Sequence, residues 1–65
     1  MKIKNKIKEN RARLGITQAT LAKKIGLSRP TMGKIENGHT PNLLTALKLA
    51  EAFEVSVDEL FKLNN

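Results

Sequence analysis

Apolar residues recur along this chain at helical spacing, and glycines divide them into segments. The first segment ends at Gly15, the second at Gly26 and the third at Gly38. Glycine adopts the left-handed backbone conformation of a helix end without strain from a Cβ atom. The spacing therefore predicts a helix that stops at Gly15, a second over residues 17–25 and a third over residues 29–37.

Residues whose side chains commonly cap helices stand where these segments begin. Thr17 and Ser28 precede the second and third segments, and Asn42 precedes a fourth. An oxygen on such a side chain accepts a hydrogen bond from a free backbone N–H in the first turn. Ser56 and Glu59 have the spacing of a capping box, which predicts a short fifth helix.

The fourth segment has the clearest amphipathic pattern. At 100° per residue six of its apolar positions share an arc of about 160°, namely Leu43, Ala46, Leu47, Leu49, Ala50 and Phe53. Lys48, Glu51 and Thr45 fall outside this arc. Strand-like alternation is confined to Lys2-Ile3-Lys4. The pattern predicts a compact all-α fold, a single domain of five helices over residues 1–65.

The charge of the chain is unevenly distributed. Its 65 residues carry a formal charge of +6, with a pI of about 10.1. Residues 1–40 hold ten Lys and Arg against two Glu, which gives +8, whereas residues 41–65 hold two Lys against four acidic residues, which gives −2. This asymmetry indicates a polyanionic partner, with nucleic acid ahead of an anionic membrane surface. A solubilising surface is the alternative interpretation.

The composition argues against several kinds of chemistry. The sequence has no Cys and one His, so disulfides, thiolate nucleophiles and metal sites are not expected. The acidic residues fit solvated helix positions or caps, and no glycine-rich phosphate loop occurs, so we expect no enzyme, no cofactor and no small-molecule ligand. No apolar run approaches the roughly 20 residues of a membrane span. We expect a soluble, cytoplasmic protein.

The stretch from Gln18 to Asn37 carries the functional signal. It combines a small residue in mid-helix, Ala22, with a glycine at the following turn, Gly26. Ala22 lets a second helix cross close by, and Gly26 permits a sharp turn. Inward-facing apolar residues then hold the two helices at a steep angle, namely Leu21, Ile25, Met32 and Ile35. This pattern predicts a helix-turn-helix motif over about residues 17–38, whose second helix can enter a DNA major groove.

At this point the chain resembles the Cro/CI-type (XRE) helix-turn-helix family, from about residue 5 to residue 62. The matching signatures are Gly15-Ile-Thr-Gln18, Leu21-Ala22, Ile25-Gly26-Leu27-Ser28-Arg29, Ile35-Glu36-Asn37-Gly38, Pro41, Ala50-x-x-Phe53-x-Val55-Ser56 and Asp58-Glu59-Leu60-Phe61. The resemblance implies a lambda-repressor-like domain of five helices that binds an operator in double-stranded DNA, usually as a homodimer on a near-palindromic site. Repression is the expected outcome because so small a chain has little surface for recruiting polymerase.

Candidate base contacts lie on the second helix of the motif. Arg29 stands in its first turn and can donate two hydrogen bonds to guanine O6 and N7, while Lys34, one turn on, can contact a base or a phosphate. The resemblance implies base contact at Arg29, Pro30 and Lys34, and Thr31 and Gly33 complete the candidate set. Gly33 costs about 1 kcal/mol relative to Ala inside a helix. Either it lets the helix sit deeper in the groove, or it is a tolerated weak position.

Candidate phosphate contacts flank that helix. Gln18 begins the first helix of the motif, where a side-chain amide and a backbone N–H can both meet a phosphate. The resemblance implies a second phosphate site at Asn37 and the loop Gly38-His39-Thr40. Thr17 and Ser28, at the two helix starts, complete the set.

The resemblance also assigns structural roles. The residues that match Arg11 and Glu36 form a partly buried ion pair in the family, although Arg11 could instead contact the DNA backbone. Positions that depart from the family pattern include Asn10, where Leu is common, Thr20, where Glu is common, and Glu54, which replaces the usual Gly after the fourth helix. A left-handed Glu54 would cost roughly 1–2 kcal/mol.

Two other functions draw on the same features. A protein-interaction or antitoxin-like adaptor could use an apolar patch of Leu44, Val57, Phe61 and Leu63, although core packing plus a self-dimer contact explains these residues as well. Membrane-surface binding could use residues 2–8, but two isoleucines make a thin anchor. We therefore expect a double-stranded DNA partner and no membrane.

Overall fold

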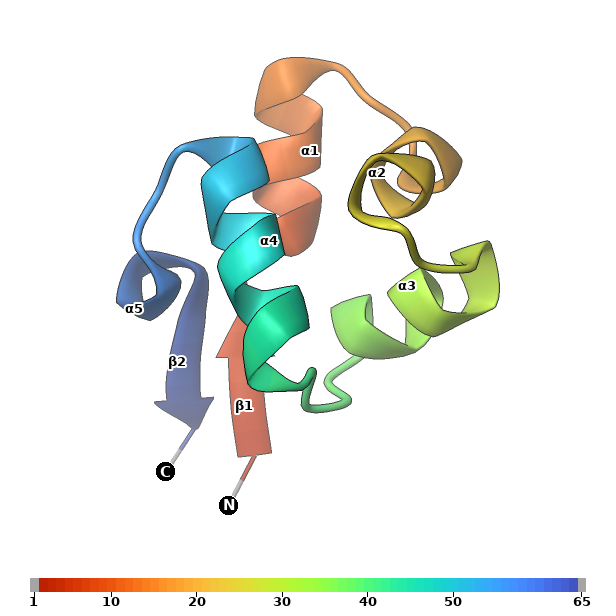
Figure 1. Ribbon diagram of the computed structural model, residues 1–65. Coiled ribbons are helices and arrows are strands. Elements are labelled where there is room, and N and C mark those ends of the chain that lie inside the picture. The colour runs from red at the N-terminus through yellow and green to blue at the C-terminus, as the bar shows by residue number, and fades with distance from the viewer. Residues whose placement is uncertain (1, 65) are drawn as a thin grey trace.

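The computed structural model describes residues 2–64, and within them the chain forms five helices and two short strands (Figure 1). In chain order the elements are β1 (Lys2–Asn5), α1 (Ile7–Leu14), α2 (Gln18–Ile25), α3 (Arg29–Glu36), α4 (Leu43–Phe53), α5 (Val57–Leu60) and β2 (Phe61–Asn64). The five helices confirm the prediction made from caps and glycines. The helix-turn-helix pair, α2 and α3, lies on the side of the molecule opposite α5 and β2 (Figure 1).

The two strands form an antiparallel sheet that joins the two ends of the described chain. Asn5, the last residue of β1, pairs with Phe61, the first residue of β2. The Lys6 N–H donates to the Leu60 carbonyl (2.9 Å) and extends this connection into α5. The prediction of an all-α fold was therefore only approximate. The alternation at Lys2-Ile3-Lys4 lies in β1, but a two-stranded ribbon is marginal on its own, and the pairing of β1 with the opposite end of the chain leaves no local pattern.

The predicted capping residues all act as caps. In each case a side-chain oxygen accepts a hydrogen bond from the backbone N–H three residues later: Thr17 from Thr20 (3.0 Å), Ser28 from Thr31 (3.3 Å), Asn42 from Thr45 (2.8 Å) and Ser56 from Glu59 (3.2 Å). These bonds satisfy donors that a helix leaves free in its first turn. They fix where α2, α3, α4 and α5 begin.

The capping box that starts α5 is complete. The Glu59 carboxylate accepts hydrogen bonds from the Ser56 backbone N–H (3.0 Å) and from the Ser56 hydroxyl (2.8 Å). Both bonds favour the ionised carboxylate, so they lower the pKa of Glu59 below its ordinary value. This helix of four residues is thus stabilised by its cap as well as by the burial of Leu60.

Three helices end at a residue in the left-handed conformation. Gly15 ends α1 and Gly26 ends α2, with φ values of 68° and 78°. Glu54 ends α4 with φ 56° and ψ 43°. Within residues 2–64 it is the one residue other than glycine with a positive φ. Glu54 therefore carries the predicted strain of roughly 1–2 kcal/mol, which a glycine would avoid.

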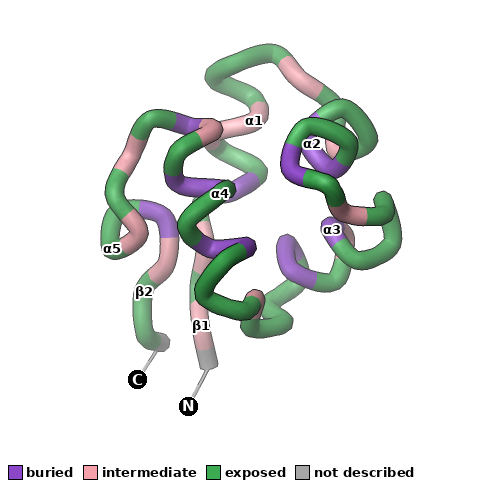
Figure 2. Tube along the Cα trace, in the orientation of Figure 1, coloured by how far each residue is buried: buried purple, intermediate pink, exposed green. Residues whose placement is uncertain are grey.

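The core lies between the helices, and their inward sides are buried (Figure 2). Its fully buried large side chains are Ile7, Leu21, Met32, Leu49, Phe53 and Leu60. Each of the five helices contributes at least one of them. In a chain this short such burial is the main favourable term in folding, so the helices stabilise one another.

The buried face of α4 differs from the predicted one. Leu43 and Leu47 were expected inside, yet 72% and 50% of their surfaces are exposed, whereas Thr45 is buried. The buried stripe is therefore rotated by about 50° around the helix axis relative to the apolar arc. The apolar arc is wider than the neighbouring helices cover. As a result Leu43, Leu44 and Leu47 remain on the surface at the N-terminal half of α4.

Candidate nucleic-acid interface

The helix-turn-helix geometry rests on a few buried contacts between α2 and α3. Ala22 on α2 is buried, as are Met32 and Ile35 on α3, which confirms their predicted inward orientation. The turn between the helices passes through left-handed Gly26, and the Leu27 N–H donates to the Ala22 carbonyl (2.8 Å). These contacts hold one face of α3 against the core and leave its opposite face to solvent.

The outer face of α3 presents the candidate base contacts. Arg29, Pro30, Thr31 and Lys34 are all exposed. Ser28 caps the helix and also donates from its hydroxyl to the Thr31 hydroxyl (2.8 Å). Pro30 is tolerated in the first turn because a donor there would have no helical acceptor. The face therefore combines two cations with a proline and a hydroxyl.

The side-chain amide of Gln18 lies next to Gly33 of α3. A Cβ atom built on Gly33 would be 3.7 Å from Gln18 Oε1 and 3.8 Å from Gln18 Nε2. Gln18 is half-buried, and it is the first residue of α2. The structure thus brings a candidate phosphate contact and a candidate base contact side by side, and the missing side chain of Gly33 leaves space beside the amide.

The other end of α3 adjoins the loop that follows it. Thr31 and Lys34 share a shallow groove with His39 and Thr40 of that loop. The loop conformation is held by a hydrogen bond from the His39 N–H to the Lys34 carbonyl (3.0 Å). Asn37, the C-cap of α3, is exposed next to this loop. His39 and Thr40 therefore line one groove with Thr31 and Lys34 of α3.

Two of the proposed phosphate contacts also have hydrogen-bond partners in the protein. The Thr17 hydroxyl accepts from the Thr20 N–H and donates to the Thr20 hydroxyl (2.9 Å), while Ser28 is paired with Thr31 in the same way. Both hydroxyls are exposed. They define the starts of α2 and α3, which aim free backbone N–H groups outward, the arrangement that favours an anion.

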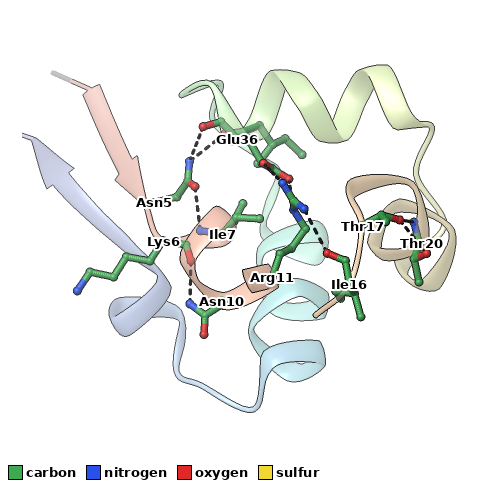
Figure 3. A network of polar contacts seen from close by, with 10 residues as sticks. Asn5, Lys6, Ile7, Asn10, Arg11, Ile16, Thr17, Thr20 and Glu36 are labelled. Carbon is green, nitrogen blue, oxygen red and sulfur yellow. Dashed lines mark hydrogen bonds and ion pairs between the residues drawn. The ribbon is translucent and has the colours of Figure 1, made fainter. Parts of the chain in front are cut away.

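Arg11 and Glu36 form a two-point ion pair between α1 and α3 (Figure 3). Arg11 Nε donates to Glu36 Oε2 (2.9 Å) and Arg11 Nη2 to Glu36 Oε1 (3.1 Å). The third guanidinium nitrogen, Nη1, donates to the Ile16 carbonyl (3.2 Å). No part of the Glu36 side chain is exposed, against 20% of that of Arg11. With its guanidinium engaged in this way, Arg11 fixes α3 from within.

Sequence reasoning missed two polar side chains that connect elements. Asn5 donates from Nδ2 to the Ile35 carbonyl at the end of α3 (2.9 Å), across 30 residues of sequence. Arg13 donates from Nη2 to the Phe53 carbonyl at the end of α4 (3.0 Å) and to Asn10 Oδ1 (3.1 Å). An asparagine just before a helix is a recognisable turn signal, but its contact with α3 depends on the fold.

Cationic side chains are exposed on both helices of the motif. Lys23 and Lys24 lie in the last turn of α2, and Arg29 and Lys34 lie on α3. Positive charge beside a helix with an exposed outer face is the electrostatic pattern of a DNA-binding surface. Among residues 2–64 no helix has the length and apolar character needed to cross a membrane.

Comparisons with known proteins agree with this geometry. The sequence model of the helix-turn-helix family matches residues 7–60. The uncharacterized HTH-type transcriptional regulator YgzD of Bacillus subtilis is 44% identical over 60 residues, which cover 91% of each chain. The uncharacterized HTH-type transcriptional regulator MJ0272 of Methanocaldococcus jannaschii is 45% identical over 60 residues, again 91% of each chain. The cryptic phage CTXphi transcriptional repressor RstR of Vibrio cholerae is 39% identical over 61 residues, 92% of this chain and 54% of RstR.

The matched segment contains all five helices, from the first residue of α1 to the last residue of α5. Similarity over nearly the whole length, together with the α2–α3 geometry, supports DNA-binding transcription regulation. The chain belongs to the Cro/CI-type helix-turn-helix family.

Proposed function

We propose that this protein is a sequence-specific transcriptional regulator, acting as a repressor, that occupies a DNA operator with α3 in the major groove. The observation that carries the proposal is the exposed face of α3, which holds Arg29 and Lys34, with the Gln18 amide beside Gly33 and the His39 loop beside Thr31 and Lys34. Base contacts at the centre with phosphate contacts at both edges are what a groove-binding helix requires.

Arg29 has the central role in base recognition. Its guanidinium can donate two parallel hydrogen bonds to O6 and N7 of a guanine, a pairing that discriminates against other bases by about 1–3 kcal/mol. Lys34 lies five residues further along α3, is also exposed, and contacts a second base or a phosphate. Pro30 and Gly33 offer no donor from a side chain and suit an apolar contact, such as a thymine methyl group. Thr31 is the fifth candidate base contact on α3.

Phosphate contacts orient α3 in the groove. Gln18 and Thr17 sit at the N-terminal end of α2, where the helix dipole favours an anion. Asn37, His39 and Thr40 hold the second phosphate at the other end of the interface. These contacts carry little sequence information. They supply the salt-dependent part of the affinity.

The protein binds its operator as a homodimer. A single domain of this size covers one half-site, and two copies related by two-fold symmetry cover a near-palindrome with half-sites about 10–10.5 base pairs apart. The exposed leucines of α4 (Leu43, Leu44 and Leu47) favour self-association, because apolar side chains that lie together on a surface gain from being covered. In the apolar patch expected from the sequence, Val57 and Phe61 pack against the core, whereas Leu44 and Leu63 are exposed.

The proposal is tested by selecting ligands from random duplex DNA at physiological salt. We expect an enriched near-palindromic sequence whose binding constant falls with salt, with a log–log slope of about −0.9 for each phosphate neutralised. The stoichiometry of the selected complex should be two chains per duplex. Recovery of no enriched sequence, with weak binding to all duplexes alike, would contradict operator recognition.

An adaptor that binds another protein is the second candidate function, and the exposed α4 leucines favour it. Such a protein would enrich no DNA sequence and would lack the steep salt dependence. Replacing Leu43 and Leu44 by Ser separates the two functions. For a DNA-binding homodimer, this change weakens self-association and lowers affinity for the full palindrome, while binding to an isolated half-site is retained.

A further inference from the structure

One side chain outside the helix-turn-helix motif links three elements at the C-terminal end of α3. Asn5, the last residue of β1, donates from Nδ2 to the Ile35 carbonyl (2.9 Å) and makes a longer contact with the Glu36 carbonyl (3.5 Å) (Figure 3). Its Oδ1 accepts from the Ile7 N–H (3.1 Å). Asn5 therefore connects β1 to the start of α1 and to the end of α3.

Each of these bonds involves a backbone group that a helix leaves free. Lys6, the N-cap of α1, makes no capping bond with its side chain, so Asn5 supplies the acceptor for the first turn. Ile35 is one of the last residues of α3, and the carbonyls of these residues accept no hydrogen bond from a later turn of the helix. The Ile35 carbonyl also accepts a hydrogen bond from the Gly38 N–H (3.0 Å). Both Nδ2 and Oδ1 of Asn5 thus form hydrogen bonds with the backbone of other elements.

The bond to Ile35 acts on the backbone of α3, whereas the Arg11–Glu36 ion pair acts on a side chain. The N-terminal end of α3 is fixed by the turn that follows Gly26. The tilt of α3 therefore depends on the contacts that hold its C-terminal end. An eight-residue helix is about 12 Å long, so a tilt of about 10° moves its C-terminal end by roughly 2 Å. Hydrogen bonds to base edges tolerate far less than this.

We propose that Asn5 is a positioning residue for DNA recognition. By holding the C-terminal end of α3 to the end of the β1–β2 sheet, it keeps Lys34 and the outer face of α3 at the angle that base contact requires. This inference rests on the proposed function. Sequence discrimination depends on it more than overall affinity does, because attraction to phosphates is long-range and base contacts are short-range.

The test compares Asn5→Asp with Asn10→Asp in the full chain. Asp at position 5 keeps an acceptor for the Ile7 N–H but places an oxygen against the Ile35 carbonyl. Asn10 donates to the Lys6 carbonyl (2.8 Å) at the start of α1. Asn10→Asp therefore makes the same chemical change and adds the same negative charge away from α3. Asn5→Ser is a neutral variant that keeps a capping oxygen but is too short to reach α3. It remains informative if Asn5→Asp folds poorly.

Two quantities are measured, at a temperature where circular dichroism shows each variant folded. The first is the ratio of affinities for the selected and a scrambled duplex. We expect both Asn5 variants to lower this ratio roughly three- to tenfold, as for one lost hydrogen bond, and Asn10→Asp to leave it unchanged. The second is amide hydrogen exchange in the free protein, which we expect to become faster at Asn37 and Gly38 in the Asn5 variants alone.

The outcomes separate the two proposals. A wild-type protein that prefers the selected duplex, with Asn5 variants that keep the full ratio, overturns the positioning role and leaves the proposed function intact. A ratio lowered equally by Asn10→Asp also overturns it, because the loss then follows charge or stability. A wild-type protein with no duplex preference overturns the proposed function and this inference together. In that case the exchange data would show whether Asn5 still orders the end of α3.

Discussion

The Glu36 carboxylate is held inside the protein by two hydrogen bonds from Arg11, at 2.9 and 3.1 Å. Its side chain has no exposed surface, and Arg11 reaches it from α1, 25 residues earlier in the chain. A buried carboxylate is tolerable only when its charge is paired and its oxygens are hydrogen-bonded. The pair therefore fixes the end of α3 to α1 and makes the fold sensitive to the loss of either partner.

Replacing the two partners should have unequal effects. Arg11→Met leaves a buried carboxylate without a counter-charge, which costs about 3–5 kcal/mol, comparable with the whole stability of so small a domain. Glu36→Gln leaves Arg11, which is partly exposed and can be hydrated, so we expect a smaller loss. Thermal unfolding followed by circular dichroism should show Arg11→Met far less stable than Glu36→Gln. Equal loss in both variants would contradict this account of the pair.

Glu54→Gly should stabilise the protein. The residue ends α4 with φ 56°, and glycine adopts that conformation without the cost of roughly 1–2 kcal/mol that a side chain brings. Glu54→Ala is the matched control, because it removes the same charge and keeps a Cβ atom. Urea unfolding should place Glu54→Gly above both Glu54→Ala and the wild type. A gain shared equally by the two variants would assign the effect to charge.

Gly33→Ala should stabilise α3 by about 1 kcal/mol. The added methyl group would meet the Gln18 amide at 3.7 Å, an ordinary van der Waals distance, so the fold has room for it. If Gly33 faces a base, as proposed, the same methyl group lowers affinity for the selected duplex. Thermal unfolding and duplex titration of the one variant test both statements. A more stable variant with unchanged affinity would make Gly33 a tolerated weak position.

The capping box of α5 should contribute to acid sensitivity through Glu59. The pKa of Glu59 is lowered in the folded protein by hydrogen bonds from the Ser56 N–H and hydroxyl. Its contribution to stability is therefore fully present above the unfolded pKa of about 4.3 and is lost as the pH falls through the lower folded value. Glu59→Gln keeps a capping box but does not titrate. Between about pH 6 and pH 3 the melting temperature of this variant should fall less than that of the wild type.

Local chemistry predicted where the helices begin and end, and the failures have a common physical cause. The Ser56 cap acts on neighbouring residues, so the sequence shows it directly, whereas a left-handed Glu54 was indicated only by the glycine that is usual there in the family. Pairing of Asn5 with Phe61 joins opposite ends of the chain and depends on the packing between them. The burial of Thr45 in place of Leu47 depends on which part of α4 its neighbours cover. Periodicity gives the direction of an apolar arc but not how much of it is covered.

The candidate site divides in the same way. The orientation of Met32 inward and Lys34 outward follows from helical spacing, and the structure has both. The position of the Gln18 amide over Gly33 depends on the crossing of α2 and α3, and the bond from Asn5 to Ile35 depends on β1. Sequence motifs therefore could not identify residues whose role depends on contact with another helix or strand.

Base recognition by Arg29 is the central claim, and the base preference of Arg29→Ala tests it most directly. Wild type and Arg29→Ala are each used to select from random duplex DNA, with Lys48→Ala, which removes one exposed positive charge on α4, as the control. We expect Arg29→Ala to lose about 1–3 kcal/mol on the preferred duplex and to relax preference at one base pair in each half-site, while Lys48→Ala keeps the wild-type preference. An equal loss on every sequence, with the preference unchanged, would contradict the account.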